Sequence, residues 1–233
     1  PSFTLSGTNV TVSEAGTTAT FTAVLSAQPA SNVILSVTSA DTGEATASPA
    51  QLTFTPSNWN TAQIVTVTGI DDNLSDGNQI TTVTVSVVDA SSDNAFDPLA
   101  DQTVAVTTSD DDSPGISATE SGGSTGTTEA GSTDTFTVVL NTQPSSDVVV
   151  SVASSDTGEV TVAPAQLTFT SSNWNSPQTV TTTGINDTTV DGSQNATLTL
   201  AVVDASSDND YDPVTDVTLI ATNTDDDAPT TTT

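Results

Sequence analysis

Apolar residues alternate with polar residues along most of this chain. In the segment 18–25, the apolar residues Ala19, Phe21, Ala23 and Leu25 occupy every second position. A period of two places successive side chains on opposite faces of a β-strand. Thr and Val dominate these runs, and both suit a pleated, half-buried surface. The alternation therefore predicts strands with an apolar face toward a core and a Thr/Ser face toward water.

The same alternation recurs throughout the chain. In the first half, further strands are predicted around Val33, Leu35, Val37, Leu52, Phe54, Val65, Val67, Val83, Val85, Val87, Val104 and Val106. In the second half, they are predicted around Phe136, Val138, Leu140, Val148, Val150, Val152, Leu167, Phe169, Leu198, Leu200 and Val202. Clusters of Gly, Pro, Asn, Asp and Ser separate the runs and indicate turns. No segment shows a convincing period of 3.6 residues, so no helix is expected.

The chain contains an internal repeat. Glu14 recurs as Glu129, and the same spacing relates Trp59 to Trp174 without insertion or deletion. Two copies in one register indicate duplication of a single folding unit.

An acidic run followed by Pro and Gly at 112–115 marks the predicted boundary between the copies. We expect one β-sandwich repeat over residues 1–112 and a second over residues 113–233, which ends in a Thr-rich linker. About seven short strands in roughly 110 residues are typical of an immunoglobulin-like sandwich. The predicted fold is thus all-β, with two tandem immunoglobulin-like Greek-key β-sandwich domains.

The composition excludes several classes of function. The 233 residues include no Lys, Arg or His, and the formal net charge is −29. Binding of nucleic acid requires cationic side chains, as does a polybasic membrane patch, so neither is expected. The absence of Cys excludes disulfides and thiolate chemistry. No apolar stretch approaches the roughly 20 residues of a membrane span, so no membrane insertion is expected.

The same composition bears on order and location. An acidic chain this poor in aromatic residues could be disordered, but the regular alternation argues against disorder. Richness in Thr, Ser, Asp and Gly without Cys favours a bacterial surface protein over a small disulfide-bonded secreted domain. We therefore expect a segment of a longer extracellular or cell-surface polypeptide.

The acidic residues concentrate in the predicted loops. Glu14 precedes the second predicted strand, Asp41 follows the third, and the run 110–112 ends the last strand of the first copy. In a Greek-key sandwich alternate loops share an end, so these carboxylates are expected to converge. Two unit charges 4 Å apart repel by about 1 kcal/mol in water and about 4 kcal/mol at an effective dielectric near 20. Calcium, which takes about 6–8 oxygen ligands, would remove this conflict.

Linked motifs in both copies resemble Calx-β-type repeats. The first copy has Val-Ser-Glu-Ala-Gly at 12–16, Gln-Leu-Thr-Phe-Thr-Pro at 51–56, Val-Thr-Val-Thr-Gly-Ile-Asp-Asp at 65–72 and Ser-Asp-Asp-Asp at 109–112. These modules are named for the calcium-binding region of sodium–calcium exchangers and occur in tandem in large bacterial surface proteins. The resemblance covers nearly the whole chain.

The resemblance implies calcium at one end of each sandwich. The implied ligands in the first repeat are Glu14, Asp41, Asp71, Asp72, Asp76, Asp110, Asp111 and Asp112. Those in the second repeat are Glu129, Asp156, Asn186, Asp187, Asp191, Asp225, Asp226 and Asp227, with Asn186 at the position of Asp71. The chain lacks the long acidic insertions and fuller Glu content of the exchanger sensors. This departure favours a structural calcium site over a signal-sensing one.

Other patterns are weighed against simpler interpretations. Asp-Thr-Gly at 41–43 and 156–158 matches the triplet of aspartic proteases, but its flanks are polar and each repeat is expected to close its own core. A glycosidase carboxylate pair lacks aromatic subsites, and the loop from Asp72 does not complete an EF-hand. The two Trp residues are interpreted as packing over a sandwich end. Asp93, Asp97, Asp208 and Asp212 are interpreted as turn-forming residues, with a second ion site as the alternative.

The predicted function is that of a calcium-stabilised structural spacer in an extracellular bacterial surface adhesin or filament, and not an enzyme. Its expected partners are calcium and neighbouring repeats of the same polypeptide. One alternative is a module that itself binds a glycan or protein partner. Another is a subunit that assembles into filaments through an edge strand or the terminal segment Pro229–Thr233.

Overall fold

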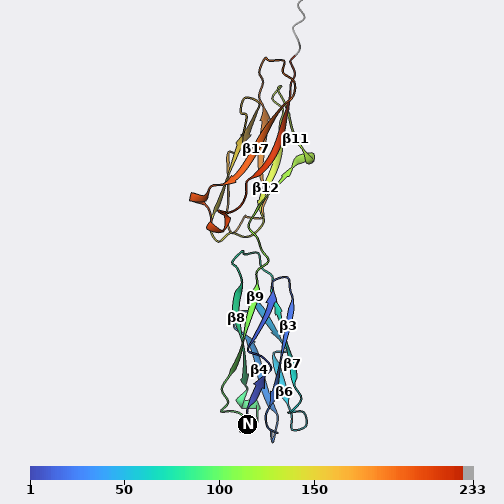
Figure 1. The fold of residues 1–233 in the computed structure, drawn as a ribbon, viewed down its shortest axis with the longest axis vertical. Coiled ribbons are helices and arrows are strands. Elements are labelled where there is room, and N and C mark those ends of the chain that lie inside the picture. The colour runs from blue at the N-terminus through green and yellow to red at the C-terminus, as the bar shows by residue number, and fades with distance from the viewer. Residues whose placement is uncertain (228–233) are drawn as a thin grey trace, which may run out of the picture. The chain divides into compact units, whose positions relative to one another are not determined.

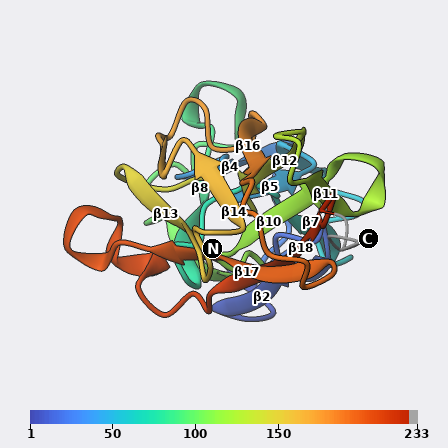
Figure 2. The same ribbon diagram turned by 90° about the horizontal axis from the view of Figure 1, so that it is seen from above.

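The computed structural model describes residues 1–227. The chain divides into two compact units, Pro1–Asp111 and the residues from Asp112 onward. Both units consist of β-strands in two sheets, which confirms the predicted pair of β-sandwich domains (Figures 1 and 2). The terminal segment Pro229–Thr233, singled out as a linker or assembly strand, lies outside the described residues.

The first unit contains nine strands. They are β1 (Phe3–Leu5), β2 (Asn9–Ser13), β3 (Thr18–Leu25), β4 (Val33–Ser39), β5 (Ala45–Ser48), β6 (Gln51–Phe54), β7 (Gln63–Gly69), β8 (Gln79–Val87) and β9 (Gln102–Ser109), with the 3-10 turn η1 (Asp89–Ser91) after β8. One sheet has the order β1-β3-β7-β5, and the other has the order β2-β9-β8-β4-β6.

The second unit repeats this arrangement. Its strands are β10 (Ile116–Glu120), β11 (Thr125–Thr128), β12 (Thr133–Leu140), β13 (Val148–Ser154), β14 (Val160–Ala163), β15 (Gln166–Phe169), β16 (Gln178–Gly184), β17 (Gln194–Val202) and β18 (Val217–Thr224). The 3-10 turns are η2 (Ser121–Gly123), η3 (Asp204–Ser206) and η4 (Asn209–Tyr211). The sheet orders are β10-β12-β16-β14 and β11-β18-β17-β13-β15.

The alternation of the sequence explains the core of each unit. In β3, Phe21, Ala23 and Leu25 are buried, and Thr22 and Val24 between them are partly exposed. The other predicted apolar positions supply most of the remaining core. Trp59 and Trp174 are half-buried and pack against their own cores, as the packing interpretation expects.

In each unit, every connection between consecutive strands except the last passes from one sheet to the other. In the first unit, β1 pairs antiparallel with β3, whereas the next strand, β2, pairs parallel with β9. Likewise, β5 pairs with β7 and β6 pairs with β4. The switch after β1 matters for the acidic loops, because it places the end of β2 beside the end of β9, where Ser13 lies opposite Ser109.

Candidate metal centre

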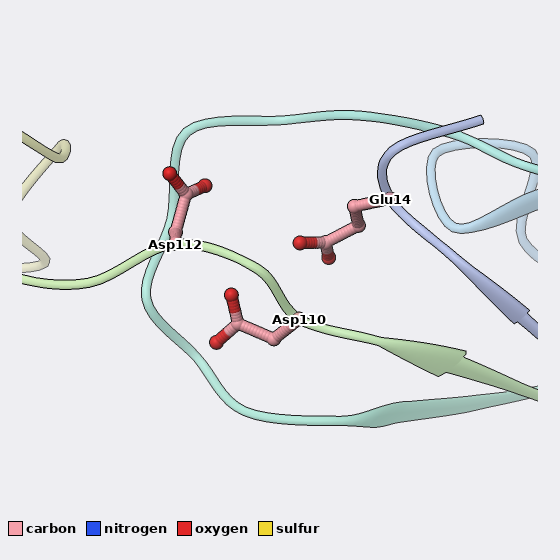
Figure 3. Close-up of side chains that lie close together, drawn as sticks. All are labelled: Glu14, Asp110 and Asp112. Atoms are coloured by element: carbon pink, nitrogen blue, oxygen red, sulfur yellow. The ribbon is translucent and has the colours of Figure 1, made fainter. Parts of the chain in front are cut away.

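The end of β2 and the end of β9 bring together three carboxylates in the first unit. Glu14, Asp110 and Asp112 each offer an oxygen within 4.8 Å of the oxygens of the other two. Figure 3 shows the three side chains close together, with Glu14 following β2 and both Asp residues following β9. The N–H of Glu14 donates to the backbone oxygen of Ser109 at 3.1 Å, which extends the parallel pairing to the site.

The loop between β7 and β8 passes around these three side chains (Figure 3). The N–H of Gly77 donates to Asp110 Oδ2 at 2.7 Å, and the N–H of Asp110 donates to Asn78 Oδ1 at 3.2 Å. Gly77 has a φ of 73°, a conformation that glycine adopts without strain. Asp72 lies on the same loop, and its charge raises the pKa of Glu14.

Alternation explains which of the three consecutive aspartates join the group. In an extended chain, residues two apart share a side and their middle neighbour points away. Asp110 and Asp112 accordingly lie with Glu14. Asp111 donates its backbone N–H to Glu14 Oε2 at 3.4 Å, and its side chain lines a hollow of about 390 Å³ together with Glu14 and Asp71.

Burial makes the Glu14 carboxylate unusual. Glu14 is only 1% exposed, and burial raises its pKa from 4.5 to about 7. The N–H of Asp111 lowers this pKa, whereas the charges of Asp110, Asp72 and Glu44 raise it. A carboxylate in this position gains from a cation, because a cation offsets both the burial and the repulsion.

Glu44, directly before β5, is a further acidic residue at this end that the sequence-based ligand set did not include. Burial raises its pKa, as do the charges of Asp76, Asp72, Asp41 and Asp110. Within residues 1–227, its Oε2 is buried without a hydrogen-bond partner. The repeat could have pointed to this position, because Glu159 occupies the equivalent place in the second copy.

The second unit repeats the first group. Glu129, Asp225 and Asp227 have oxygens within 4.8 Å of one another. The N–H of Gly192 donates to Asp225 Oδ2 at 2.8 Å, and the N–H of Asp226 donates to Glu129 Oε2 at 3.4 Å. Burial raises the pKa values of Glu129 and Asp227, and neighbouring aspartates add to both shifts.

The second unit also has another group. Glu159, Asp187 and Asp191 meet the same 4.8 Å criterion. Their first-unit equivalents are Glu44, Asp72 and Asp76, which form no such group within residues 1–227. Asn186 is exposed beside Asp187. The two units therefore differ in how they arrange the acidic residues at these three equivalent positions.

The Asp residues of the Asp-Thr-Gly triplets close local turns. Asp41 Oδ1 accepts the N–H of Gly43 at 2.8 Å, and Asp156 Oδ1 accepts the N–H of Gly158 at 2.9 Å. Asp41 lies near enough to Glu44 for its charge to raise the pKa of Glu44. Asp156 is in none of the three acidic groups found within residues 1–227.

Asp93 and Asp208 have the predicted turn-forming role. Asp93 Oδ2 accepts the N–H of Ser31 at 3.2 Å, and its Oδ1 accepts the N–H of Ala95 at 3.0 Å. Asp208 Oδ2 accepts the hydroxyl of Ser145 at 2.7 Å.

The geometry of the three acidic groups fits a hard divalent cation. Calcium binds oxygen at about 2.3–2.6 Å, so two ligands of one ion lie at most about 5 Å apart. The 4.8 Å groups satisfy this limit, and all their donor atoms are carboxylate oxygens. The residues that would hold the ions are the nine members of these groups, and the bound ion would supply the positive charge that no side chain of this chain provides.

Comparisons with known proteins give likenesses of fold. No family model matches the chain, and no curated protein matches it. Among solved structures, CBD12 from CALX1.2 is similar, with 12% identity, a TM-score of 0.39, and coverage of 95% of this chain and 100% of that chain. Domains 4 and 5 of the S-layer protein SbsC are similar with 16% identity and a TM-score of 0.38, over 82% of this chain and 70% of that chain.

The E. coli chaperone DraB has 8% identity and a TM-score of 0.37, over 94% of this chain and 98% of that chain. No helix within residues 1–227 has the length and apolar character needed to cross a membrane.

Proposed function

We propose that the chain is a calcium-stabilised structural spacer of an extracellular surface protein, such as an adhesin or filament. The observation that carries this proposal is Glu14, a carboxylate that is 1% exposed and lies with Asp110 and Asp112 in a chain without cationic side chains. No side chain of this protein can neutralise such a group, so its charge is met either by a proton, which the raised pKa of Glu14 favours, or by a metal cation from solution. The equivalent group around Glu129 supports the same role in the second unit.

The proposed location follows from the affinity expected of such a site. Extracellular calcium modules have dissociation constants of about 10⁻⁴–10⁻³ M. Sites of this affinity are occupied at the calcium concentrations found outside cells. The acidic groups lie on loops at strand ends, where an ion joins segments that the sheets alone do not fix. Each filled site is expected to stiffen the unit that contains it, which is the property required of a spacer.

Thermal unfolding of the whole chain tests this function. With calcium at about 100 times its dissociation constant, one site adds about 2.7 kcal/mol, which raises Tm by about 10 °C for a unit of this size. The comparison is between calcium, EDTA, and sodium chloride at the ionic strength of the calcium buffer. Equal Tm values in all three conditions would reject the proposed function.

A further inference from the structure

A buried amide distinguishes the acidic end of the second unit from that of the first. Asn223 in β18 is 0% exposed, and Thr108 of β9 occupies the equivalent position in the first unit. Its Nδ2 donates to Glu159 Oε2 at 3.2 Å and to the backbone oxygen of Ile185 at 3.1 Å. Asn223 therefore reaches from a core strand into the group formed by Glu159, Asp187 and Asp191.

A second difference between the units completes the contacts of this amide. The Thr127 hydroxyl donates to Asn223 Oδ1 at 3.0 Å, and the first unit has the apolar Val12 at the position of Thr127. With these three bonds, the amide donates twice through its nitrogen and accepts once through its oxygen. Burial of an amide is unfavourable unless its hydrogen bonds are made. The buried Asn223 therefore depends on the hydroxyl of Thr127, and the two residues form a hydrogen-bonded pair.

The first unit offers its glutamate no such donor. The Thr108 hydroxyl donates to the backbone oxygen of Glu44 at 3.2 Å, not to its carboxylate. Within residues 1–227, Glu44 Oε2 is buried without a hydrogen-bond partner, and Glu159 has no such orphaned oxygen. The glutamate lies among acids in both units, but only in the second unit does a neutral side chain donate a hydrogen bond to its carboxylate.

We propose that Asn223 is a positioning residue that holds Glu159 in place in the cation-free protein, so that the second unit keeps its acidic end without calcium and the first unit does not. This inference rests on the proposed calcium function. Asn223 is not assigned as a ligand, because its oxygen accepts from Thr127 and its nitrogen faces the carboxylate.

Each unit contains one Trp, packed on its own core, which allows the two units to be followed separately in the full chain. In a Trp59→Phe background, fluorescence reports the unfolding of the second unit, and in a Trp174→Phe background it reports the first. The variant is Asn223→Thr with Thr127→Val, which gives the second unit the residues of the first. The matched control is Asn195→Thr, an exposed position on the adjacent strand β17.

The expected result is a change in calcium dependence. The double variant should lower the Tm of the second unit by about 5 °C more in EDTA than in saturating calcium, because a bound ion replaces the lost donor. The Asn195→Thr control should shift Tm equally in both conditions. An equal shift for the double variant in EDTA and calcium would assign Asn223 to packing alone and overturn the inference.

A reciprocal variant tests the inference even if the first variant does not fold. Val12→Thr with Thr108→Asn should place an amide beside Glu44 and reduce the Tm loss of the first unit in EDTA by about 5 °C. An unchanged loss in a folded protein would also overturn the inference. Failure of the proposed function has a separate signature, because the parent chain would then unfold at the same temperature in calcium and EDTA.

Discussion

Acidic side chains in this protein experience two opposite environments. Asp93 accepts backbone N–H groups from Ala95, Ala30 and Ser31, and these bonds lower its pKa. Glu14 is buried among other acids, and its pKa rises to about 7. Residues of the first kind fix turns by themselves, whereas those of the second kind need an added positive charge. The opposite pKa shifts of Asp93 and Glu14 therefore follow from their local environments.

The raised pKa of Glu14 predicts how cation-free stability depends on pH. The unfolded side chain titrates near 4.5 and the folded one near 7, so the folded protein binds more protons between these values. In EDTA, the free energy of unfolding should therefore fall as pH rises from 4.5 to 7. The fall attributable to Glu14 is at most about 3 kcal/mol. Glu129, whose pKa is also raised, acts in the same direction.

Urea unfolding in EDTA across this pH range provides the measurement. Glu14→Gln should reduce the pH dependence of the first unit, followed by Trp59 fluorescence in the Trp174→Phe background. Glu44, whose pKa is also raised, should account for dependence that remains. Saturating calcium should suppress the dependence in the parent chain, because it binds the ionised carboxylate. Stability that is constant or rises between pH 4.5 and 7 would contradict the assigned environment of Glu14.

At the scale of elements, the site depends on a close approach between two strand ends. A Cβ on Gly69, at the end of β7, would overlap the backbone of Ser13, the last residue of β2. Gly184 has the same relation to Thr128 in the second unit. Because Glu14 directly follows Ser13, the missing side chain at position 69 helps to set the position of Glu14.

Gly69→Ala is accordingly expected to disturb the calcium site as well as the fold. The added methyl group must push β2 away from β7, at a cost of about 1–3 kcal/mol. The displacement should weaken calcium binding by the first unit, which titration of that unit's Trp fluorescence can follow. Gly7→Ala is the matched control in the same unit, since the nearest atom that a Cβ there would meet is the backbone oxygen of Asn9 at 3.9 Å. Equal calcium affinity for the parent and Gly69→Ala would contradict this role.

The strands of the core could be predicted from alternation, as could the short edge strands β6 and β15, whereas the edge strands β1 and β5 could not. Strand β3 has a clear period of two, whereas β1 and β5 contain three and four residues and carry little pattern. The parallel pairing of β2 with β9 is likewise invisible in local sequence, because it depends on a segment that changes sheets.

The acidic groups could also be predicted from the sequence only in part. The duplication predicted that acids at repeat-equivalent loop positions converge, and Glu14 with Asp110 and Glu129 with Asp225 do so. The ligand assignment itself stays a prediction. Glu159 is absent from the sequence-based ligand set, although it lies in a group with Asp187 and Asp191. Glu159 is far from these two residues in the sequence, and only the fold brings the loop before β14 beside Asp187 and Asp191.

At the scale of the whole molecule, charge dominates. With a formal net charge of −29 and no Lys, Arg or His, the side chains offer no ion pairs to balance the acids. Salt screens exposed charges over about 10 Å at 0.1 M, but it acts far less on a buried group such as Glu14. On the proposed function, we expect dissolved cations to act in two ways, diffusely over the surface and specifically at the buried groups.

Calorimetric titration of the intact chain with calcium at constant ionic strength measures the specific part most directly. The parent chain should give a saturable binding heat, and Glu14→Gln together with Glu129→Gln should abolish most of it. A matched pair of substitutions at the exposed turn residues Asp89 and Asp204 should leave the heat unchanged. No saturable heat in the parent chain, or equal heats in the parent and the Glu14→Gln/Glu129→Gln variant, would contradict the assignment of these buried carboxylates to calcium.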